Sequence, residues 1–246
     1  MISNLHVQAV ILAAGKGTRM NSLKAKILYK VGGKPILLHS LALCRNLTSH
    51  PPIVVINGKS KAVRKLIKIA KAIPVIENSP QGTGSSVRMA LPHLSSSVSH
   101  ILVVNSDDSF LYRLSSIREM LRRHIDNHHH LTFLTTIPKQ NYTNVNRKVV
   151  RDNSGKFIDL QPSESTNEVV CGAYVFDVSW LKSHVPLVKI NPQKNEYFIT
   201  DLLLIALEKR SRVSPYVLKD PNEWWGVNTK EDLKYARKLW RQLHEP

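Results

Sequence analysis

The sequence is poor in several residue types whose scarcity excludes whole classes of protein. Its 246 residues include two cysteines, Cys44 and Cys171, which form neither a metal-binding spacing nor a disulfide framework. We expect two buried thiols. No apolar run approaches the roughly 18–20 residues of a membrane span, and the first residues lack the basic-then-apolar pattern of a signal peptide. A cytoplasmic protein is the simplest expectation.

Acidic residues are also scarce. The chain has 18 Asp and Glu against 35 Lys and Arg, a formal net charge of +17. This charge attracts polyanions without saying which, so nucleotides, sugar phosphates, nucleic acid and anionic membrane all qualify. The densest basic segment, 59–71, has one apolar helical face formed by Val63, Leu66, Ile67 and Ala70. This pattern favours a solvated helix over a nucleic-acid or membrane surface. The sequence leaves the oligomeric state open.

Strands and helices alternate through the first half of the chain. Short apolar, β-branched runs predict strands, and longer periodic segments predict helices. The expected strands are 7–13, 53–56, 73–76 and 101–104, and the expected helices are 35–47, 59–71 and 85–94. This alternation predicts an α/β fold with a doubly wound sheet.

The second half has a different order of elements. Strands are expected at 131–137 and 169–176, and the turn Asp152-Asn153-Ser154-Gly155 predicts a hairpin over 148–160. Helices are expected at 196–210 and 230–243. The length fits a single domain over 1–246, in which we expect a nucleotide-binding lobe at 1–112 and a sugar-phosphate-binding lobe at 113–246.

The loop after the first strand has the residues of an anion site. Gly15 and Gly17 allow the backbone to approach a ligand and to point its N–H groups inward. Lys16 and Arg19 add positive charge, and arginine can hold phosphate with two parallel hydrogen bonds. The spacing matches neither a P-loop nor a dinucleotide fingerprint, so the loop alone fits an ordinary tight turn equally well.

Together with later segments, this loop resembles the signature of the sugar-1-phosphate nucleotidyltransferases, most closely the uridylyltransferases of N-acetylglucosamine 1-phosphate. The segments that carry the likeness occur in the family's order: Leu12 to Met20 with Lys26 and Gly33-Lys34-Pro35, Gln81-Gly82-Thr83-Gly84, Asp107, Asn195 to Asp201, and Gly226-Val227-Asn228. The resemblance implies a Rossmann-like doubly wound mixed sheet with helices on both faces, the nucleotide-diphospho-sugar transferase fold.

The resemblance also implies a role for each matching residue. Arg19 and Lys26 would be catalytic, and Asp107 and Asn228 would hold Mg²⁺. The nucleotide would lie against Leu12, Ala13, Ala14, Gly15, Lys16, Gly17, Glu77, Gln81, Gly82 and Thr83. The sugar would lie against Asn146, Gly172, Glu196 and Thr200. The implied reaction transfers the nucleotidyl group of a nucleoside triphosphate, UTP first, to a sugar 1-phosphate and releases pyrophosphate.

That reaction needs no protein nucleophile. Its requirements are positioning and neutralisation of the charge that develops on phosphate oxygens. Mg²⁺ prefers oxygen ligands and keeps several waters, so one carboxylate and one amide oxygen are sufficient protein ligands. Each residue also has a structural alternative: Lys26 could be a surface lysine, and Asp107 or Asn228 could cap a helix.

Several positions depart from the family pattern and leave the substrates open. Glu77 replaces a glutamine that reads uracil, and a carboxylate only accepts hydrogen bonds. On the sugar side, Val170-Cys171-Gly172 and Asn146 differ from the usual residues. A cytidylyltransferase for phosphocholine or a related alcohol phosphate is therefore an alternative, as is a non-catalytic basic binding module. The sequence stops before the family's acetyltransferase β-helix would begin, so acetyl transfer is not expected.

Overall fold

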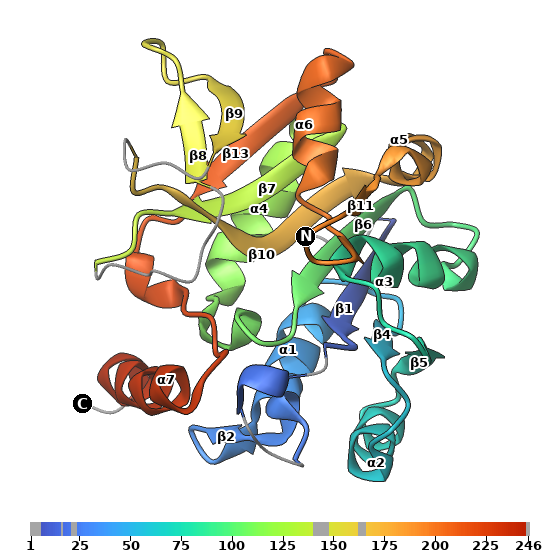
Figure 1. The fold of residues 1–246 in the computed structure, drawn as a ribbon, viewed down its shortest axis with the longest axis vertical. Helices are drawn as coiled ribbons and strands as arrows, with labels where there is room; N and C mark the ends of the chain where they lie inside the picture. The colour runs from blue at the N-terminus through green and yellow to red at the C-terminus, as the bar shows by residue number, and fades with distance from the viewer. Residues whose placement is uncertain (1–5, 16, 21–23, 140–147, 162–165, 245–246) are drawn as a thin grey trace.

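The structure, a computed structural model, describes residues 6–15, 17–20, 24–139, 148–161 and 166–244 (Figure 1). A nine-stranded sheet runs through its centre in the order β13-β7-β10-β6-β1-β4-β5, and the hairpin β8–β9 pairs with β10. Its strands are β1 Val7–Ala13, β4 Ile53–Ile56, β5 Ile73–Ile76, β6 His100–Asn105, β7 Leu131–Thr136, β8 Lys148–Arg151, β9 Phe157–Gln161, β10 Val169–Asp177 and β13 Val213–Val217.

The sheet is mixed. Strands β6, β1, β4 and β5 run parallel to one another, β7 and β13 are parallel, and β10 is antiparallel to β6 and β7. The carboxyl ends of β1 and β6 therefore meet at the same edge, where parallel sheets bind ligands. The predicted α/β class with a mixed, doubly wound sheet is confirmed.

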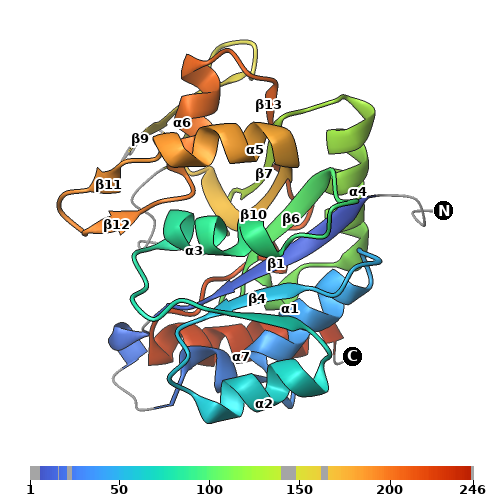
Figure 2. The same cartoon turned by 90° about the vertical axis from the view of Figure 1, so that its right-hand side faces the viewer.

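Helices cover both faces of the sheet because alternate residues of its strands point to opposite sides. In β1, Val7, Ala9 and Ile11 pack with α1 Ile36–Arg45, α2 Lys61–Ile69 and α4 Leu114–Asp126. Val10 and Leu12 pack on the other face with α3 Thr83–Ala90, α5 Val178–His184 and α6 Asp201–Glu208. Figure 2 shows α1 and α2 on one side of the sheet and α3 and α5 on the other.

The last helix, α7 Lys230–His244, lies beside the loops that follow β1 and β6. Its Leu233, Ala236 and Leu239 form a third cluster with Met20, Val31 and Leu111. The short hairpin β2 Lys30–Val31 and β3 Lys34–Pro35 packs against it, and Arg237 Nε donates to Lys30 O at 3.0 Å. This packing brings the end of the sequence to the first loop.

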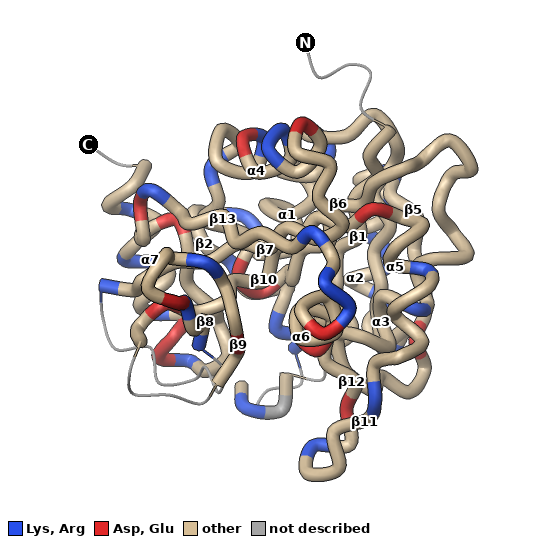
Figure 3. The backbone as a smooth tube through the Cα atoms, turned by 90° about the horizontal axis from the view of Figure 1, so that it is seen from above, with Lys and Arg blue, Asp and Glu red and all other residues tan. Residues whose placement is uncertain are grey.

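Two expectations about the helices are changed by the structure. The helix expected at 196–210 begins at Asp201, because Glu196–Tyr197 forms strand β12 with β11 Ile190–Asn191. The helix expected at 85–94 is α3 followed by a 3₁₀ turn, Leu91–His93, that contains a proline. The basic helix α2 buries Val63 and Ile67 and exposes its lysines, as its periodicity predicts (Figure 3 colours the charged residues).

Both cysteines are buried, as expected. Among the described residues no group of three or more His, Cys, Asp or Glu side chains could hold a metal ion. None of the helices in those ranges has the length and apolar character needed to cross a bilayer.

Buried His124 provides a prediction about acid stability. This residue of α4 places its Nδ1 2.9 Å from Thr132 Oγ1, and burial together with neighbouring histidines lowers its pKa to about 3. In the unfolded chain the His124 ring binds a proton with its ordinary pKa of 6.5, whereas in the folded chain the ring stays neutral at that pH. The stability contributed by the neutral ring is therefore complete above pH 6.5 and falls as the pH drops. At pH 5 we expect a loss of about 2 kcal/mol, at roughly 1.4 kcal/mol per pH unit.

Urea unfolding of the wild type and of His124→Asn, at neutral pH and at pH 5, measures this contribution. The variant should be less stable at neutral pH and should lose about 2 kcal/mol less than the wild type on acidification. Equal losses in the two proteins would show that His124 does not carry the effect.

Candidate functional site

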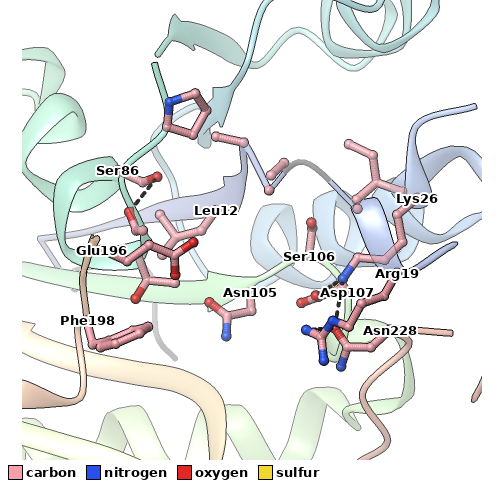
Figure 4. Close-up of a pocket in the computed structure, with 18 of the residues that line it drawn as sticks. Leu12, Arg19, Lys26, Ser86, Asn105, Ser106, Asp107, Glu196, Phe198 and Asn228 are labelled. Carbon is pink, nitrogen blue, oxygen red and sulfur yellow. Dashed lines mark hydrogen bonds and ion pairs between the residues drawn. The ribbon is translucent and has the colours of Figure 1, made fainter. Parts of the chain in front are cut away.

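A cavity of about 570 Å³ opens at the carboxyl ends of β1 and β6. Its walls come from five parts of the chain: the loop after β1, the start of α3, the end of β6, the segment before α6 and the segment before α7. The lining residues are Leu12, Ala13, Ala14, Gly15, Gly17, Arg19, Lys26, Ile27, Pro80, Gly82, Thr83, Ser86, Asn105, Ser106, Asp107, Lys194, Glu196, Phe198 and Asn228. Figure 4 shows Arg19, Lys26, Asp107 and Asn228 together at one end of it.

Those four side chains form a connected polar cluster. Lys26 Nζ makes an ion pair with Asp107 Oδ2 and donates to Asn228 Oδ1 at 3.2 Å. Arg19 Nη2 donates to the same Asn228 oxygen at 2.9 Å. The cluster spans more than two hundred residues of sequence, from Arg19 to Asn228. The peptide N–H of Val227 donates to Asp107 O at 3.0 Å and holds the segment of Asn228 beside that of Asp107. All four residues predicted to be catalytic or metal-binding thus lie at one place.

Helix capping does not account for Asn228 or Asp107. Helix α7 is capped by a reciprocal pair, in which Asp232 N–H donates to Thr229 Oγ1 and Asp232 Oδ2 accepts from the N–H of Thr229 and Asn228. The side chain of Asn228 faces the cavity instead (Figure 4). The Asp107 carboxylate contacts Lys26. Asp107 Oδ2 and Asn228 Oδ1 therefore lie against the same ammonium group.

The donor set of this cluster fits a small divalent cation. Asp107 offers a carboxylate and Asn228 an amide oxygen, and both lie within hydrogen-bond reach of one Nζ atom. Oxygen ligands of this kind, completed by phosphate oxygens and water, are what Mg²⁺ prefers. That Asp107 and Asn228 hold Mg²⁺ stays a prediction.

The glycine-rich segment at the start of α3 forms another wall. Gly82 and Thr83 line the cavity with Pro80 and Ser86. Glu77 does not line it: its carboxylate is buried and accepts from Ser85 Oγ at 2.5 Å and from Ser86 Oγ at 2.6 Å. Glu77 therefore acts on the cavity through Ser86, and its predicted contact with the base is untested.

Gly82 cannot carry a side chain without displacing its neighbours. Its φ is +95°, and a Cβ there would lie 2.6 Å from Tyr197 O and 2.9 Å from Glu196 Cβ. We expect Gly82→Ala to lower kcat/KM by at least about tenfold, because backbone strain of about 1–3 kcal/mol is added to the clash. Steady-state kinetics of the purified variants measure the effect.

The matched control is Gly155→Ala, which also has a left-handed φ, +81°, but has nothing within 4 Å of the added Cβ. It lies in the β8–β9 turn, which is not part of the cavity wall, so activity should stay near that of the wild type. An equal loss of activity in both variants would contradict the steric explanation.

The segment 194–198 forms a further wall of the cavity. Glu196 lines it, as predicted, and Lys194 and Phe198 line it too. Thr200 precedes α6 and is not in the cavity wall. Lys16 and Asn146, predicted to contact the nucleotide and the sugar, lie outside the described residues.

Gly172 is buried and does not line the cavity. Its N–H donates to Asp108 Oδ2 at 2.9 Å, and a Cβ would lie within 2.6 Å of the side chains of Asp108 and Asn105. Gly172 thus packs against these two residues, and its predicted sugar contact is untested. Burial, and then the neighbouring carboxylate of Asp107, raises the pKa of Asp108 well above its usual range.

Sequence reasoning missed five polar or aromatic residues of the cavity wall: Ser86, Asn105, Ser106, Lys194 and Phe198. Asn105 could have been found, because it is the last residue of a strand that ends at the ligand-binding edge. Lys194 and Phe198 flank Glu196, but nothing in their spacing shows that they face the cavity.

A family model described as the MobA-like NTP transferase domain matches residues 9–148. The chain belongs to this family. It is a nucleotidyltransferase, and the resemblance drawn from its motifs is confirmed. The bifunctional protein GlmU of Streptococcus pyogenes serotype M12 (strain MGAS2096) is 32% identical over 241 residues, which cover 95% of this chain and 57% of that protein. The GlmU of serotype M49 (strain NZ131) is also 32% identical over 241 residues, which cover 95% of this chain and 52% of that protein. The chain thus spans about half the length of these relatives.

Solved structures show the same fold at lower sequence identity. A putative glucose-1-phosphate thymidylyltransferase from Bacillus anthracis superposes with a TM-score of 0.82 at 16% identity, covering 98% of this chain and 97% of that one. The inositol-1-phosphate CTP transferase from T. maritima superposes with a TM-score of 0.74 at 14% identity, with the same coverage of both chains.

Proposed function

We propose that this nucleotidyltransferase uses Mg²⁺ to transfer the uridylyl group of UTP to a sugar 1-phosphate, with N-acetylglucosamine 1-phosphate as the first candidate. The observation that carries the proposal is the convergence of Arg19, Lys26, Asp107 and Asn228 at one end of the cavity. Two cations and two oxygen ligands at one point suit a triphosphate and its metal ion.

Two walls of the cavity support a division of labour between the halves of the chain. Residues up to Asp107 supply the loop after β1 and the start of α3, which we assign to the nucleotide. Lys194, Glu196 and Phe198 come from the second half and are assigned to the acceptor. Glu196 can accept hydrogen bonds from sugar hydroxyls, and Phe198 can pack against a sugar ring. The lobes 1–112 and 113–246 are proposed on this basis.

The reaction follows from these assignments. A phosphate oxygen of the acceptor forms a bond to the α-phosphorus, and the bond from that phosphorus to the bridging oxygen of pyrophosphate breaks. Lys26 neutralises charge on the α-phosphate, and Arg19 and the Gly15–Gly17 backbone hold the outer phosphates. When bound, Mg²⁺ would withdraw negative charge from the phosphate oxygens beside Asp107 and Asn228.

The hydrogen bond of Ser86 favours a nucleobase that presents an N–H group to the cavity. Its hydroxyl donates to Glu77, so toward the cavity Ser86 Oγ can only accept. The N3–H of uracil meets this requirement, but so does the exocyclic amine of cytosine. A cytidylyltransferase is therefore the second candidate, and the choice of base decides between them.

Pyrophosphate release from each of the four nucleoside triphosphates, paired with a panel of sugar 1-phosphates and with phosphocholine, tests the proposal. We expect the highest kcat/KM for UTP with an amino-sugar or hexose 1-phosphate in the presence of Mg²⁺. A preference for CTP and phosphocholine would overturn the substrate assignment. Release from no pair would overturn the proposed reaction.

A further inference from the structure

Arg88 of α3 holds the two ends of one hairpin. Its Nε and Nη2 donate to Val185 O at 3.2 and 2.8 Å, and Nη2 also donates to Val188 O at 2.7 Å. The guanidinium carbon lies 4.5 Å from the centre of the Tyr197 ring. Val188 comes two residues before strand β11, and Tyr197 ends strand β12. One side chain therefore fixes where the β11–β12 hairpin begins and where it ends.

The same hairpin is fastened to the start of α3. The N–H of Tyr197 donates to Gln81 O at 2.7 Å, and the N–H of Ile199 donates to Thr83 Oγ1 at 2.9 Å. Gly82 and Gly84 have no side chains, which lets the Tyr197 backbone approach closely. Figure 2 shows the hairpin projecting beside α3. The position of the hairpin therefore follows the position of this helix.

The hairpin carries two of the charged residues of the cavity wall, Lys194 and Glu196. Arg88 and Tyr197 are not in that wall, and the Arg88 guanidinium contacts Tyr197 of the hairpin and the residues that lead into it. The glycine-rich loop before α3 has a separate anchor, since Glu77 accepts from the N–H of Gln81 in this loop and from Ser85 and Ser86 of α3. Loss of Arg88 would therefore loosen the hairpin, which keeps its bonds to Gln81 and Thr83, while Glu77 still holds the loop.

We propose that Arg88 and Tyr197 are a positioning pair that holds Lys194 and Glu196 over the cavity and so sets the affinity for the acceptor. The inference rests on the proposed function, in which those two residues face the acceptor. Arginine suits this role because its planar fork makes three hydrogen bonds to carbonyls while one face stacks on the tyrosine ring. A lysine can donate to a carbonyl but cannot form the fork and the stack together.

The test compares four substitutions under saturating nucleotide. Arg88→Met keeps the length of the side chain and removes the fork, and Tyr197→Leu removes the ring. We expect each to raise the KM for the sugar phosphate by about tenfold, the effect of losing one well-placed hydrogen-bonded contact. Arg88→Lys should fall between Arg88→Met and the wild type. Tyr197→Phe retains the ring and should stay within about twofold of the wild type.

The Kd of UTP, measured by calorimetry without acceptor, should change less than about twofold in all four variants, because Glu77 still anchors the loop. The matched control is Arg45→Met, which removes a guanidinium bond to a backbone carbonyl, Ala70 O at 2.8 Å, at a place outside the cavity wall. Its acceptor KM should match that of the wild type. Unchanged acceptor KM in Arg88→Met would overturn the proposal, as would an equal loss of UTP and acceptor affinity.

Amide hydrogen exchange distinguishes failure of this inference from failure of the proposed function. In Arg88→Met, exchange should rise over residues 190–197 and remain unchanged in α7, whether or not the protein turns over any sugar phosphate. Unchanged exchange in the hairpin would overturn the positioning role. If Arg88→Met does not fold, Tyr197→Leu and Arg88→Lys provide the same comparison.

Discussion

Replacement of Lys26 by methionine is expected to lower kcat by about 10²–10³-fold, the range seen when one preorganised electrostatic contact to a transition state is removed. Lys26 Nζ contacts both Asp107 and Asn228, so its charge lies where we place the α-phosphate. Methionine preserves much of the apolar stem and removes only the ammonium. Binding of UTP should weaken much less than turnover, because Arg19 and the backbone of the loop after β1 remain.

The control is Lys24→Met, two residues earlier in the chain. Lys24 is exposed, lies 5.0 Å from the centre of the Tyr29 ring and does not line the cavity. Its variant removes the same charge from the same loop region, and its kcat should stay within about twofold of the wild type, as surface substitutions usually do. If Lys26→Met retained activity close to that of Lys24→Met, Lys26 could not be the residue that stabilises the transition state.

The second large effect is expected from Asp107→Asn. The amide has the shape of the carboxylate but lacks its charge, and Mg²⁺ binds carboxylate oxygens far better than neutral ones. We expect a drop in activity of about 10²–10³-fold at limiting Mg²⁺, partly regained when Mg²⁺ is raised. A Mg²⁺ titration of pyrophosphate release, for the wild type and the variant, measures the shift.

Asp126→Asn is a suitable comparison, because Asp126 forms an ion pair with Arg122 on α4 and lies outside the cavity wall. Its Mg²⁺ dependence should match that of the wild type. If the half-saturating Mg²⁺ concentration were the same in Asp107→Asn and in the wild type, Asp107 would not be a metal ligand. Removal of Mg²⁺ by a chelator should abolish turnover in every variant.

The residues of the polar cluster were predicted through the family resemblance, and strand order explains part of their placement. The loop after β1 and the residues after β6 lie at the carboxyl ends of parallel strands, which always share an edge. The capping pair Thr229 and Asp232 is also local, and it explains why the Asn228 side chain can face the cavity. Strand order accounts for the edge at which the cluster lies, whereas the roles of Lys26, Asp107 and Asn228 came from the resemblance.

Other features depend on contacts between distant residues and could not be predicted. Periodicity extended the helix that begins at Asp201 back to 196, but the N–H of Tyr197 donates to Gln81 O across the molecule and keeps that segment extended. The burial of Glu77 and Gly172 is a second example. Ser85 and Ser86 donate to Glu77, and the N–H of Gly172 donates to Asp108, while the predicted ligand contacts of both residues stay predictions. Whether a side chain faces a cavity or lies under its wall is decided by such neighbours.

The fate of each phosphate of the nucleotide tests the central claim most directly. We would incubate the protein with Mg²⁺, a sugar 1-phosphate and UTP labelled at either the α- or the γ-phosphorus, and then separate the products. The proposed function predicts that the α-label enters the nucleotide sugar and that the γ-label leaves in pyrophosphate. Transfer of the γ-label to the sugar, or its release as inorganic phosphate alone, would contradict nucleotidyl transfer by this site.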